Sequence, residues 1–435
     1  MTRPGFPGPG FPGPPAGFRA TWAEVDLDRL ATNFAALRAL AGRQSVVLPV
    51  VKANAYGHGA TPVARRLEAE GAVGLCVAFP EEGLELRRAG ISVPILCVGA
   101  VEPGQIVAAA RSRITLALYS PEQLEIFEQA GRAAGLPVHF HLKIDTGLSR
   151  LGLLPEEIGP FLEALRTCRS ALLAGIFSNL AAADKPGETS NARQAQILAS
   201  AAEAIRTTGH DPRPVHIANS AGLLFHPALR YDAVRPGILL YGVPPVPGGE
   251  APGFAPVLAL KTTVIRVKTV PEGTAVGYGG TWRAARPTRL ATLAIGYDDG
   301  LPRSLAGKGE ILIGGRRAAL VGVISMDLAA ADVTGFDGVE AGAEAVIIGS
   351  QGSETIGLWE VAERAGSIPW EILCGIGRRV PRVHFAGTDI VSVSNPLPMV
   401  RESELVSEPP TKPRKRPPLE APGETPQTPP EAEVS

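Results

Sequence analysis

One lysine at the end of an apolar run is the first candidate for chemistry. Lys52 follows the run Val46–Val51 and precedes a polar turn that contains glycine, Ala53–Gly59. A continuous apolar run bounded by glycine is typical of a buried parallel strand. A lysine packed against apolar walls has a lowered pKa, so its neutral amine can condense with a carbonyl group or accept a proton. The alternative is a solvated lysine with no chemical role.

Further polar residues follow apolar runs along the chain. They are Lys143, Asp145, Arg150, Ser178, Asn179, Asn219, Ser220, Arg235 and Gly237. In a parallel barrel the carboxyl ends of the strands meet at one rim, and active sites lie there. Arg235 lies in an otherwise apolar run, where an unpaired buried charge would be costly. Together these residues indicate an active site, although Ser220 alone would be read as a helix N-cap.

Eight apolar runs alternate with helical patterns between residues 22 and 242. The predicted strands are Val46–Val51, Gly74–Phe79, Pro94–Val98, Ile114–Tyr119, Val138–Ile144, Leu172–Ser178, Val215–Ala218 and Ala233–Leu240. The predicted helices are Leu27–Leu40, Thr61–Glu70, Glu81–Ala89, Pro121–Ala134, Pro155–Thr167 and Thr189–Thr207. This alternation predicts parallel βαβ units, and eight strands close a barrel. An open doubly wound sheet is the alternative, but no GxGxxG follows the first strand.

The pattern changes after residue 242. Short, β-branched segments separated by turns predict a smaller, mostly-β domain. Its strands are expected at Leu258–Val270, Thr288–Ile295, Gly309–Ile313, Ala318–Ser325 and Ala343–Ile348, with one helix at Trp359–Ala365. We therefore predict an α/β fold with a (β/α)8 barrel over 20–248 and a mostly-β domain over 249–396. The Pro/Gly-rich tail over 1–19 and the Pro-rich tail over 397–435 are predicted to be disordered.

Composition narrows the possible partners and locations. The chain has 435 residues, 45% of them hydrophobic, and a formal net charge of -1. This charge gives no argument for binding nucleic acid or an anionic membrane. The four cysteines lack a CxxC spacing, and no metal site is predicted. No membrane-spanning run or secretory signal is visible, so a cytoplasmic location is expected.

The stretch Val50–Gly59, VVKANAYGHG, is similar to the pyridoxal phosphate (PLP) attachment motif of alanine racemases, which are fold-type III PLP enzymes. The resemblance extends over about Thr21–His384 and implies the same order of barrel and β domain. It implies that Lys52 holds the cofactor. The other cofactor-binding residues it implies are Tyr56, Ser220 and Gly237 at the phosphate, together with Arg150, Asn219, Arg235 and Tyr241.

The resemblance also implies a racemisation by two bases. Arg235 would face the pyridine nitrogen of PLP, where a guanidinium stays protonated and weakens the ring as an electron sink. A weaker sink favours return of the proton to Cα over transamination. Lys52 would serve one face of the substrate, and Tyr278, in AVGYGGTW, would serve the other face. Tyr278 would come from the second subunit, so a homodimer with shared sites is expected.

Supporting residues follow from the same resemblance, with three departures from it. Arg150 and Met326 would bind the substrate carboxylate, Lys143 would be a carbamylated lysine and Tyr297 would line the entry corridor. The departures are Asn179 in place of a histidine, Trp370 in place of a common tyrosine, and Val323 in place of a frequent arginine that would pair with an acid such as Asp184. They predict slower turnover or a shifted substrate range.

The function predicted on these grounds is interconversion of L- and D-alanine, supplying D-alanine for peptidoglycan. One alternative is a racemase of broader specificity, acting for example on serine. A second is a non-catalytic PLP-binding homeostasis protein, which normally lacks the second domain and a counterpart of Tyr278. A third, a fold-type III decarboxylase, would have an acidic residue where this chain has Arg235.

Overall fold

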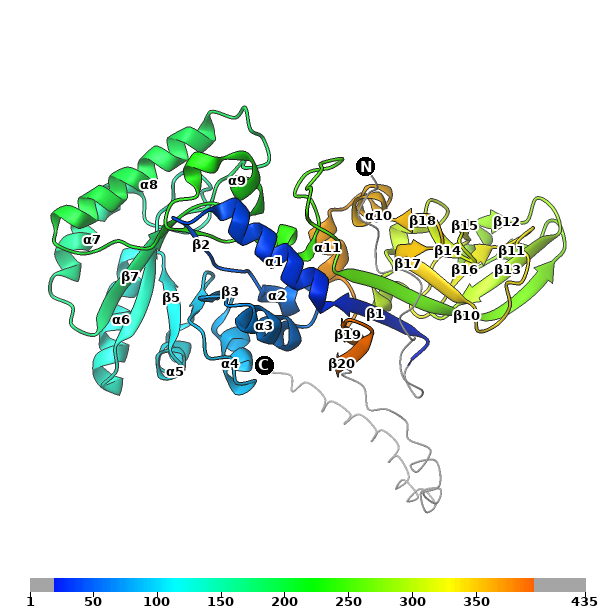
Figure 1. Ribbon diagram of the computed structural model, residues 1–435, viewed down its shortest axis with the longest axis horizontal. Helices are drawn as coiled ribbons and strands as arrows, with labels where there is room; N and C mark the ends of the chain where they lie inside the picture. The colour runs from blue at the N-terminus through cyan, green and yellow to red at the C-terminus, as the bar shows by residue number, and fades with distance from the viewer. Residues whose placement is uncertain (1–18, 395–435) are drawn as a thin grey trace, which may run out of the picture. The chain divides into compact units, whose positions relative to one another are not determined.

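Eight parallel strands between residues 46 and 234 form a sheet that closes on itself (Figure 1). In the computed structural model, which describes residues 19–394, they are β2 (Val46–Val47), β3 (Leu75–Val77), β4 (Ile95–Cys97), β5 (Ile114–Leu118), β6 (Val138–Lys143), β7 (Ala171–Phe177), β8 (Val215–His216) and β9 (Ala233–Val234). Their order is β2-β9-β8-β7-β6-β5-β4-β3. An isolated parallel bridge between Val50 and Cys76 joins the two outer strands. The predicted α/β barrel is confirmed.

Helices connect the barrel strands and cover their outer side (Figure 1). They are α1 (Leu27–Ala41), α2 (Lys52–Tyr56), α3 (Ala60–Ala69), α4 (Pro80–Arg88), α5 (Ile106–Arg111), α6 (Pro121–Ala134), α7 (Ile158–Leu165), α8 (Ser190–Thr207) and α9 (Ser220–Phe225). Five of the six predicted helices agree with these bounds to within one residue. The sixth, α7, begins later than predicted because Pro155–Glu157 form a separate 3-10 turn. The short helices α5 and α9 were not predicted, and α2 is a single turn in which residues 53–56 have positive φ.

The last barrel strand is shorter than its sequence indicated. Only Ala233–Val234 pair as β9, and Ile238–Tyr241 form a 3-10 turn, so the predicted strand Ala233–Leu240 is wrong beyond Val234. Pro236 has no N–H to donate to a ladder. The N–H groups of Gly237 and Leu239 donate to Ser220 Oγ, at 3.0 and 3.2 Å, and not to a neighbouring strand. The chain therefore turns across the mouth of the barrel at this point.

The second half of the described chain is mostly β, as predicted. Its ten-stranded sheet has the order β18-β17-β14-β15-β16-β13-β10-β1-β19-β20, with a further pairing of β17 to β10. The strands are β1 (Thr21–Asp26), β10 (Leu258–Val270), β13 (Thr288–Leu293), β14 (Glu310–Ile313), β15 (Arg316–Val321), β16 (Ala329–Asp332), β17 (Glu344–Gln351), β18 (Glu354–Ile356), β19 (Arg382–Ala386) and β20 (Asp389–Ser394). Two helices accompany them, α10 (Leu358–Ala365) and α11 (Pro369–Cys374). The first of these is the predicted helix.

The strand β1 (Thr21–Asp26) belongs to the ten-stranded sheet although it precedes the barrel in sequence. It pairs antiparallel with β10 and parallel with β19. A buried ion pair between Glu24 and Lys261, at 3.0 Å, accompanies the pairing with β10. The range 20–248 that the sequence assigns to the barrel therefore begins with a strand of the other sheet. Of the two predicted tails, 1–19 lies outside the described residues except for Arg19, and 397–435 lies wholly outside them.

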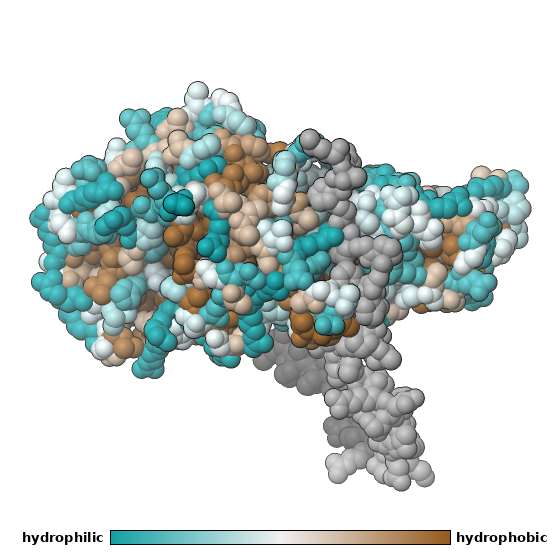
Figure 2. Space-filling model, viewed as in Figure 1, coloured by the Kyte–Doolittle hydropathy of each residue, from teal (hydrophilic) through white to brown (hydrophobic). Residues whose placement is uncertain are grey.

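The surface of the described chain mixes polar and apolar residues. The face in Figure 2 shows hydrophilic and hydrophobic side chains interspersed over the barrel and the β domain. Among residues 19–394, no helix has both the length and the apolar character needed to cross a membrane.

Candidate functional site

Lys52 is followed by a turn of left-handed backbone. The N–H of Val50 still donates to Pro236 O at the edge of β9, at 3.0 Å, so Lys52 stands just past the carboxyl end of the strand. Residues 53–56 all have φ of 52° or 53°, and Gly57 continues at 80°. Each such L-residue costs about 1–2 kcal/mol. The predicted turn is present. Its left-handed backbone could not be predicted, because Ala53 and Ala55 are not residue types that indicate positive φ.

Hydrogen bonds from outside the turn hold this strained backbone. The N–H of Ala53 donates to Glu82 Oε1 at 2.6 Å. The other oxygen, Oε2, accepts from the N–H groups of Ala78 and Phe79, at 2.7 and 3.2 Å. Glu82 lies on α4, so its carboxylate ties the turn after Lys52 to the exit of β3. This fixes the direction in which the lysine side chain leaves the barrel rim.

Backbone and hydroxyl groups gather beside Lys52, between the end of β9 and the start of α9. Ser220 Oγ accepts from the N–H groups of Gly237 and Leu239. The hydroxyl of Tyr56 lies against Gly237 so closely that a Cβ there would be 2.4 Å from Tyr56 Oη. Asn219 is the N-cap of α9, since its Oδ1 accepts from the N–H of residue 222 at 2.9 Å. Ser220 is therefore free of the capping role that its sequence position suggested.

Arg235 is buried and has no acidic partner in the part of the chain that the structure describes. Its Nη2 donates to Ser178 O at 2.7 Å, and its Nη1 donates to His216 Nδ1. Because a guanidinium only donates, the ring proton of His216 is on Nε2, and that N–H donates to His141 Nδ1 at 2.8 Å. Burial lowers the pKa of Arg235 to about 10, so it stays protonated at neutral pH.

The two histidines behind Arg235 are neutral. Burial, with the positive charge of Arg235, lowers the pKa of His141 to about 3 and that of His216 well below its ordinary value. The ring of Phe177 stacks on His216 and also faces the guanidinium, at 5.2 Å in each case. Our sequence reasoning missed both histidines. Their signal was a histidine inside an apolar strand, in HFHLK on β6 and in VHIAN on β8.

Lys143, at the end of β6, is a second amine near the barrel rim. Burial, followed by the charges of Arg150 and Arg235, lowers the pKa of Lys143 to about 8. Its Nζ lies 5.4 Å from the centre of the Phe177 ring. Arg150 is exposed on the loop after β6, where Asp145 Oδ1 accepts two backbone N–H groups. It lines a separate surface groove and does not reach the Lys52 cavity in this structure.

A cavity of about 420 Å³ brings most of the predicted site residues together at the barrel mouth. Its predicted members are Lys52, Tyr56, Asn179, Asn219, Ser220, Arg235, Gly237 and Trp370. Trp370 meets Trp359 edge to face at 6.3 Å on one side of the cavity. Tyr241 lies beneath it, where its hydroxyl donates to Val50 O at 2.9 Å. The chemistry available is that of an amine, a cradle of donors and a buried guanidinium.

Three predicted residues lie in the β domain, outside this cavity. Tyr278 is 76% exposed on a turn between β11 (Ala275–Val276) and β12 (Trp282–Arg283). Met326 and Tyr297 are 51% and 42% exposed. Their loops meet, since the N–H of Asp298 donates to Met326 O at 3.2 Å. A single chain thus presents these side chains outward and does not close its own site with them.

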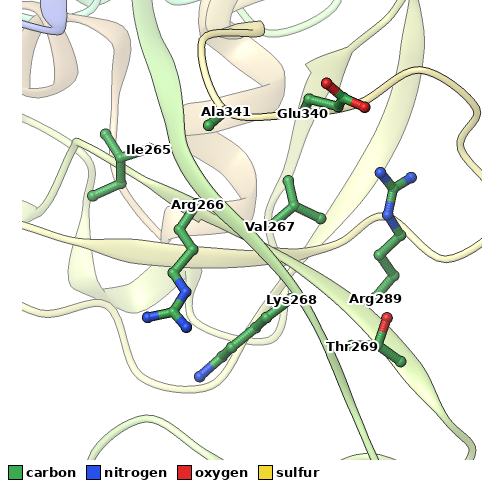
Figure 3. A pocket seen from close by; sticks show the side chains of 8 residues that line it. All are labelled: Ile265, Arg266, Val267, Lys268, Thr269, Arg289, Glu340 and Ala341. Atoms are coloured by element: carbon green, nitrogen blue, oxygen red, sulfur yellow. The ribbon is translucent and has the colours of Figure 1, made fainter.

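A second hollow lies along β10 (Figure 3). Arg266 and Lys268 project to one side of the strand, and Arg289 and Glu340 lie on the other. The hollow contains none of the predicted site residues. We therefore take the cavity at the barrel mouth, which contains eight of them, as the candidate functional site.

Comparisons with known proteins show the family to which the sequence is similar. Residues 25–245 match the family model "Alanine racemase, N-terminal domain", and residues 257–384 match "Alanine racemase, C-terminal domain". The chain is 43% identical over 373 residues to an alanine racemase of Symbiobacterium thermophilum, covering 86% of this chain and 99% of that protein. It is 40% identical over 374 residues to an alanine racemase of Geobacter sulfurreducens, covering 84% and 97%.

Solved structures give the same match. The alanine racemase of Bacillus anthracis with bound L-Ala-P has a TM-score of 0.82 at 35% identity, covering 87% of this chain and 98% of that one. The alanine racemase of the D-cycloserine producer Streptomyces lavendulae has a TM-score of 0.81 at 38% identity, covering 85% and 98%.

Proposed function

This chain belongs to the alanine racemase family, and we propose that it interconverts L- and D-alanine with PLP held at Lys52. One observation carries the proposal. A single cavity at the carboxyl ends of the barrel strands contains a lysine amine, a cradle of hydroxyl and backbone groups, and a buried guanidinium without a carboxylate partner among the described residues. Active sites of parallel barrels lie at this rim.

The residues present fit PLP. The cradle of Tyr56, Ser220 and Gly237 suits a phosphate, because Gly237 leaves room for close approach and hydroxyl groups donate to phosphate oxygens. Arg235 would donate to the pyridine nitrogen, since its acceptors in this structure are a carbonyl oxygen and a neutral imidazole and none is an acid. When bound, PLP supplies an electron-withdrawing ring that acidifies the Cα–H of an amino acid.

The chain's own residues would move the proton. Lys52 Nζ would take or return the Cα proton on one face of the substrate, and Tyr278 Oη would do so on the other. Arg235 would hold its own proton throughout, because its pKa remains far above neutral. Lys143, with a pKa of about 8, has a neutral fraction near pH 7, which carbamylation of its amine requires.

Two subunits would complete each site. Tyr278 is exposed and absent from the cavity of its own chain, which supports a homodimer in which it serves the partner's cavity. Met326, which the proposal assigns to the substrate carboxylate, is likewise exposed in the β domain. A cytoplasmic location and the supply of D-alanine for peptidoglycan are further parts of the proposal, and they rest on the role of the family.

Glu82 gives a first test of how the site is built. We expect Glu82→Gln to lower kcat/KM for L-alanine by about tenfold, because the amide turns a donor toward backbone N–H groups that need acceptors, at a cost of about 1–3 kcal/mol. Steady-state polarimetry of L-alanine racemisation measures kcat/KM. Glu81→Gln, the same change one residue earlier, is the control. Equal rates for the two variants would remove Glu82 from this role.

Trp370 tests substrate size. It narrows the cavity together with Trp359, so Trp370→Ala should raise kcat/KM for L-serine relative to L-alanine by about tenfold. Trp370→Phe keeps most of the aromatic bulk and should stay near the parent ratio. If the parent enzyme already turns over the two amino acids equally, the broader racemase is the correct assignment.

A further inference from the structure

A large cavity lies at the opposite end of the barrel from Lys52. It has a volume of about 600 Å³ and opens at the amino ends of β4, β5 and β6. The residues lining it are Arg87, Ser92, Pro94, Ala110, Arg111, Arg113, Ile114, Thr115, Leu136, Pro137 and His139. Volumes of this size are typical of small-molecule sites. Nothing in the proposed racemisation uses it.

The cavity is lined by positive charge. Three arginines line it, and within residues 19–394 none of its lining residues is an aspartate or glutamate. Arg111 and Arg113 are exposed, and their guanidinium groups make no ion pair with a carboxylate of the described chain. Their fork of N–H donors matches phosphate and carboxylate oxygens.

Arg87 builds the floor of the cavity and adds to its charge. Its guanidinium donates to four carbonyl oxygens, those of Ile91 and Val93 before β4 and those of Ser112 and Arg113 before β5, at 2.7–3.0 Å. Carbonyl groups do not neutralise its charge. Burial lowers the pKa of Arg87, the repulsion from Arg113 lowers it next, and the attraction of Glu68 opposes them less strongly. Glu68, whose Oε1 accepts from Ser92 and from the N–H of Val93, is the one acid of the described residues that opposes the charge of Arg87 here, and it does not line the cavity.

One wall of the cavity is apolar. Ala110, Ile114 and Leu136 line it beside two prolines. A free inorganic ion would leave this wall uncovered. We propose that the cavity binds a phosphorylated small molecule, whose phosphate contacts Arg111 and Arg113 and whose organic part packs on Ile114 and Leu136.

Calorimetry on the holoenzyme tests this, because bound PLP fills the phosphate cradle at the barrel mouth. The probes are adenosine monophosphate, inorganic phosphate and adenosine. The variant is Arg111→Gln with Arg113→Asn, since Arg113 has φ of 52° and asparagine tolerates that backbone. The control, Arg43→Gln with Arg206→Gln, removes two charges from exposed arginines elsewhere.

We expect the monophosphate to bind the parent and the control equally, and the variant at least tenfold more weakly, with kcat/KM for L-alanine unchanged in both. Adenosine should not bind. Phosphate bound as tightly as the monophosphate, with the same loss in the variant, would overturn the assignment to a phosphorylated molecule, because the organic part would then contribute nothing to binding. Equal binding by parent and variant, or no binding of either phosphate probe to the parent, would overturn the proposal.

Discussion

Replacing Lys52 with alanine is expected to lower kcat/KM for L-alanine by about 10³-fold or more, because the change removes the residue that we propose as both the cofactor's anchor and one of the two bases. Lys52 is the only lysine that lines the barrel-mouth cavity of the described chain. Polarimetry gives the rate. Mass spectrometry after borohydride reduction gives a second readout, since the parent should carry the cofactor on residue 52 and the variant should not.

Lys308→Ala is the matched control for this prediction. Lys308 is exposed in the β domain, so the Lys308→Ala variant should keep full activity and should still carry the reduced cofactor on residue 52. Cofactor found on a different lysine of the parent, or undiminished turnover in the Lys52 variant, would refute the assignment of the anchor.

The second prediction concerns where Tyr278 acts. We expect Lys52→Ala and Tyr278→Phe homodimers to be nearly inactive, whereas a heterodimer with one chain of each kind should show about half the parent turnover, because in a twofold dimer with shared sites one of its two sites carries both intact residues. Two different affinity tags on co-expressed chains allow the heterodimer to be purified. Racemisation of L-alanine per dimer is the measurement.

The alternative makes the opposite prediction. If Tyr278 served the cavity of its own chain, each site of the heterodimer would lack one base and its activity would stay at the level of the homodimers. An active Tyr278→Phe homodimer would instead show that this phenol is not a base. We expect an active heterodimer because the Tyr278 side chain is 76% exposed on a turn outside the cavity of its own chain.

The barrel could be predicted because its parallel strands are apolar on both faces and stand out as continuous runs. The bounds at the end of β9 could not, since they depend on Pro236 and on hydrogen bonds to Ser220, which lies at the start of the preceding helix α9. The sheet to which β1 belongs could not be predicted either. A six-residue strand carries no sign of which sheet it joins, and its partners β10 and β19 lie more than 200 residues away in sequence.

The sequence indicated many of the residues that line the cavity, but it did not indicate how the backbone and the hydrogen bonds position them. Lys52 and Arg235 stood out as charges at the end of, or inside, apolar runs, and both line the cavity. The left-handed turn after Lys52 was invisible, because alanine has no preference for that backbone and Glu82 holds it from another helix. The neutral histidine pair next to Arg235 was overlooked for a different reason. Each histidine is a single polar residue in an apolar strand, and the sequence does not show that the two side chains are hydrogen-bonded to each other.

The most direct test of the central claim is to incubate the holoenzyme with L-alanine in heavy water and to follow optical rotation and deuterium at Cα together. The account predicts that rotation falls to zero while Cα acquires deuterium, because two bases exchange the Cα proton on opposite faces. Deuterium uptake with retained rotation would contradict it, because the Cα proton would then be exchanged on one face only and by one base. Retained rotation without deuterium uptake would contradict the assignment as a racemase altogether.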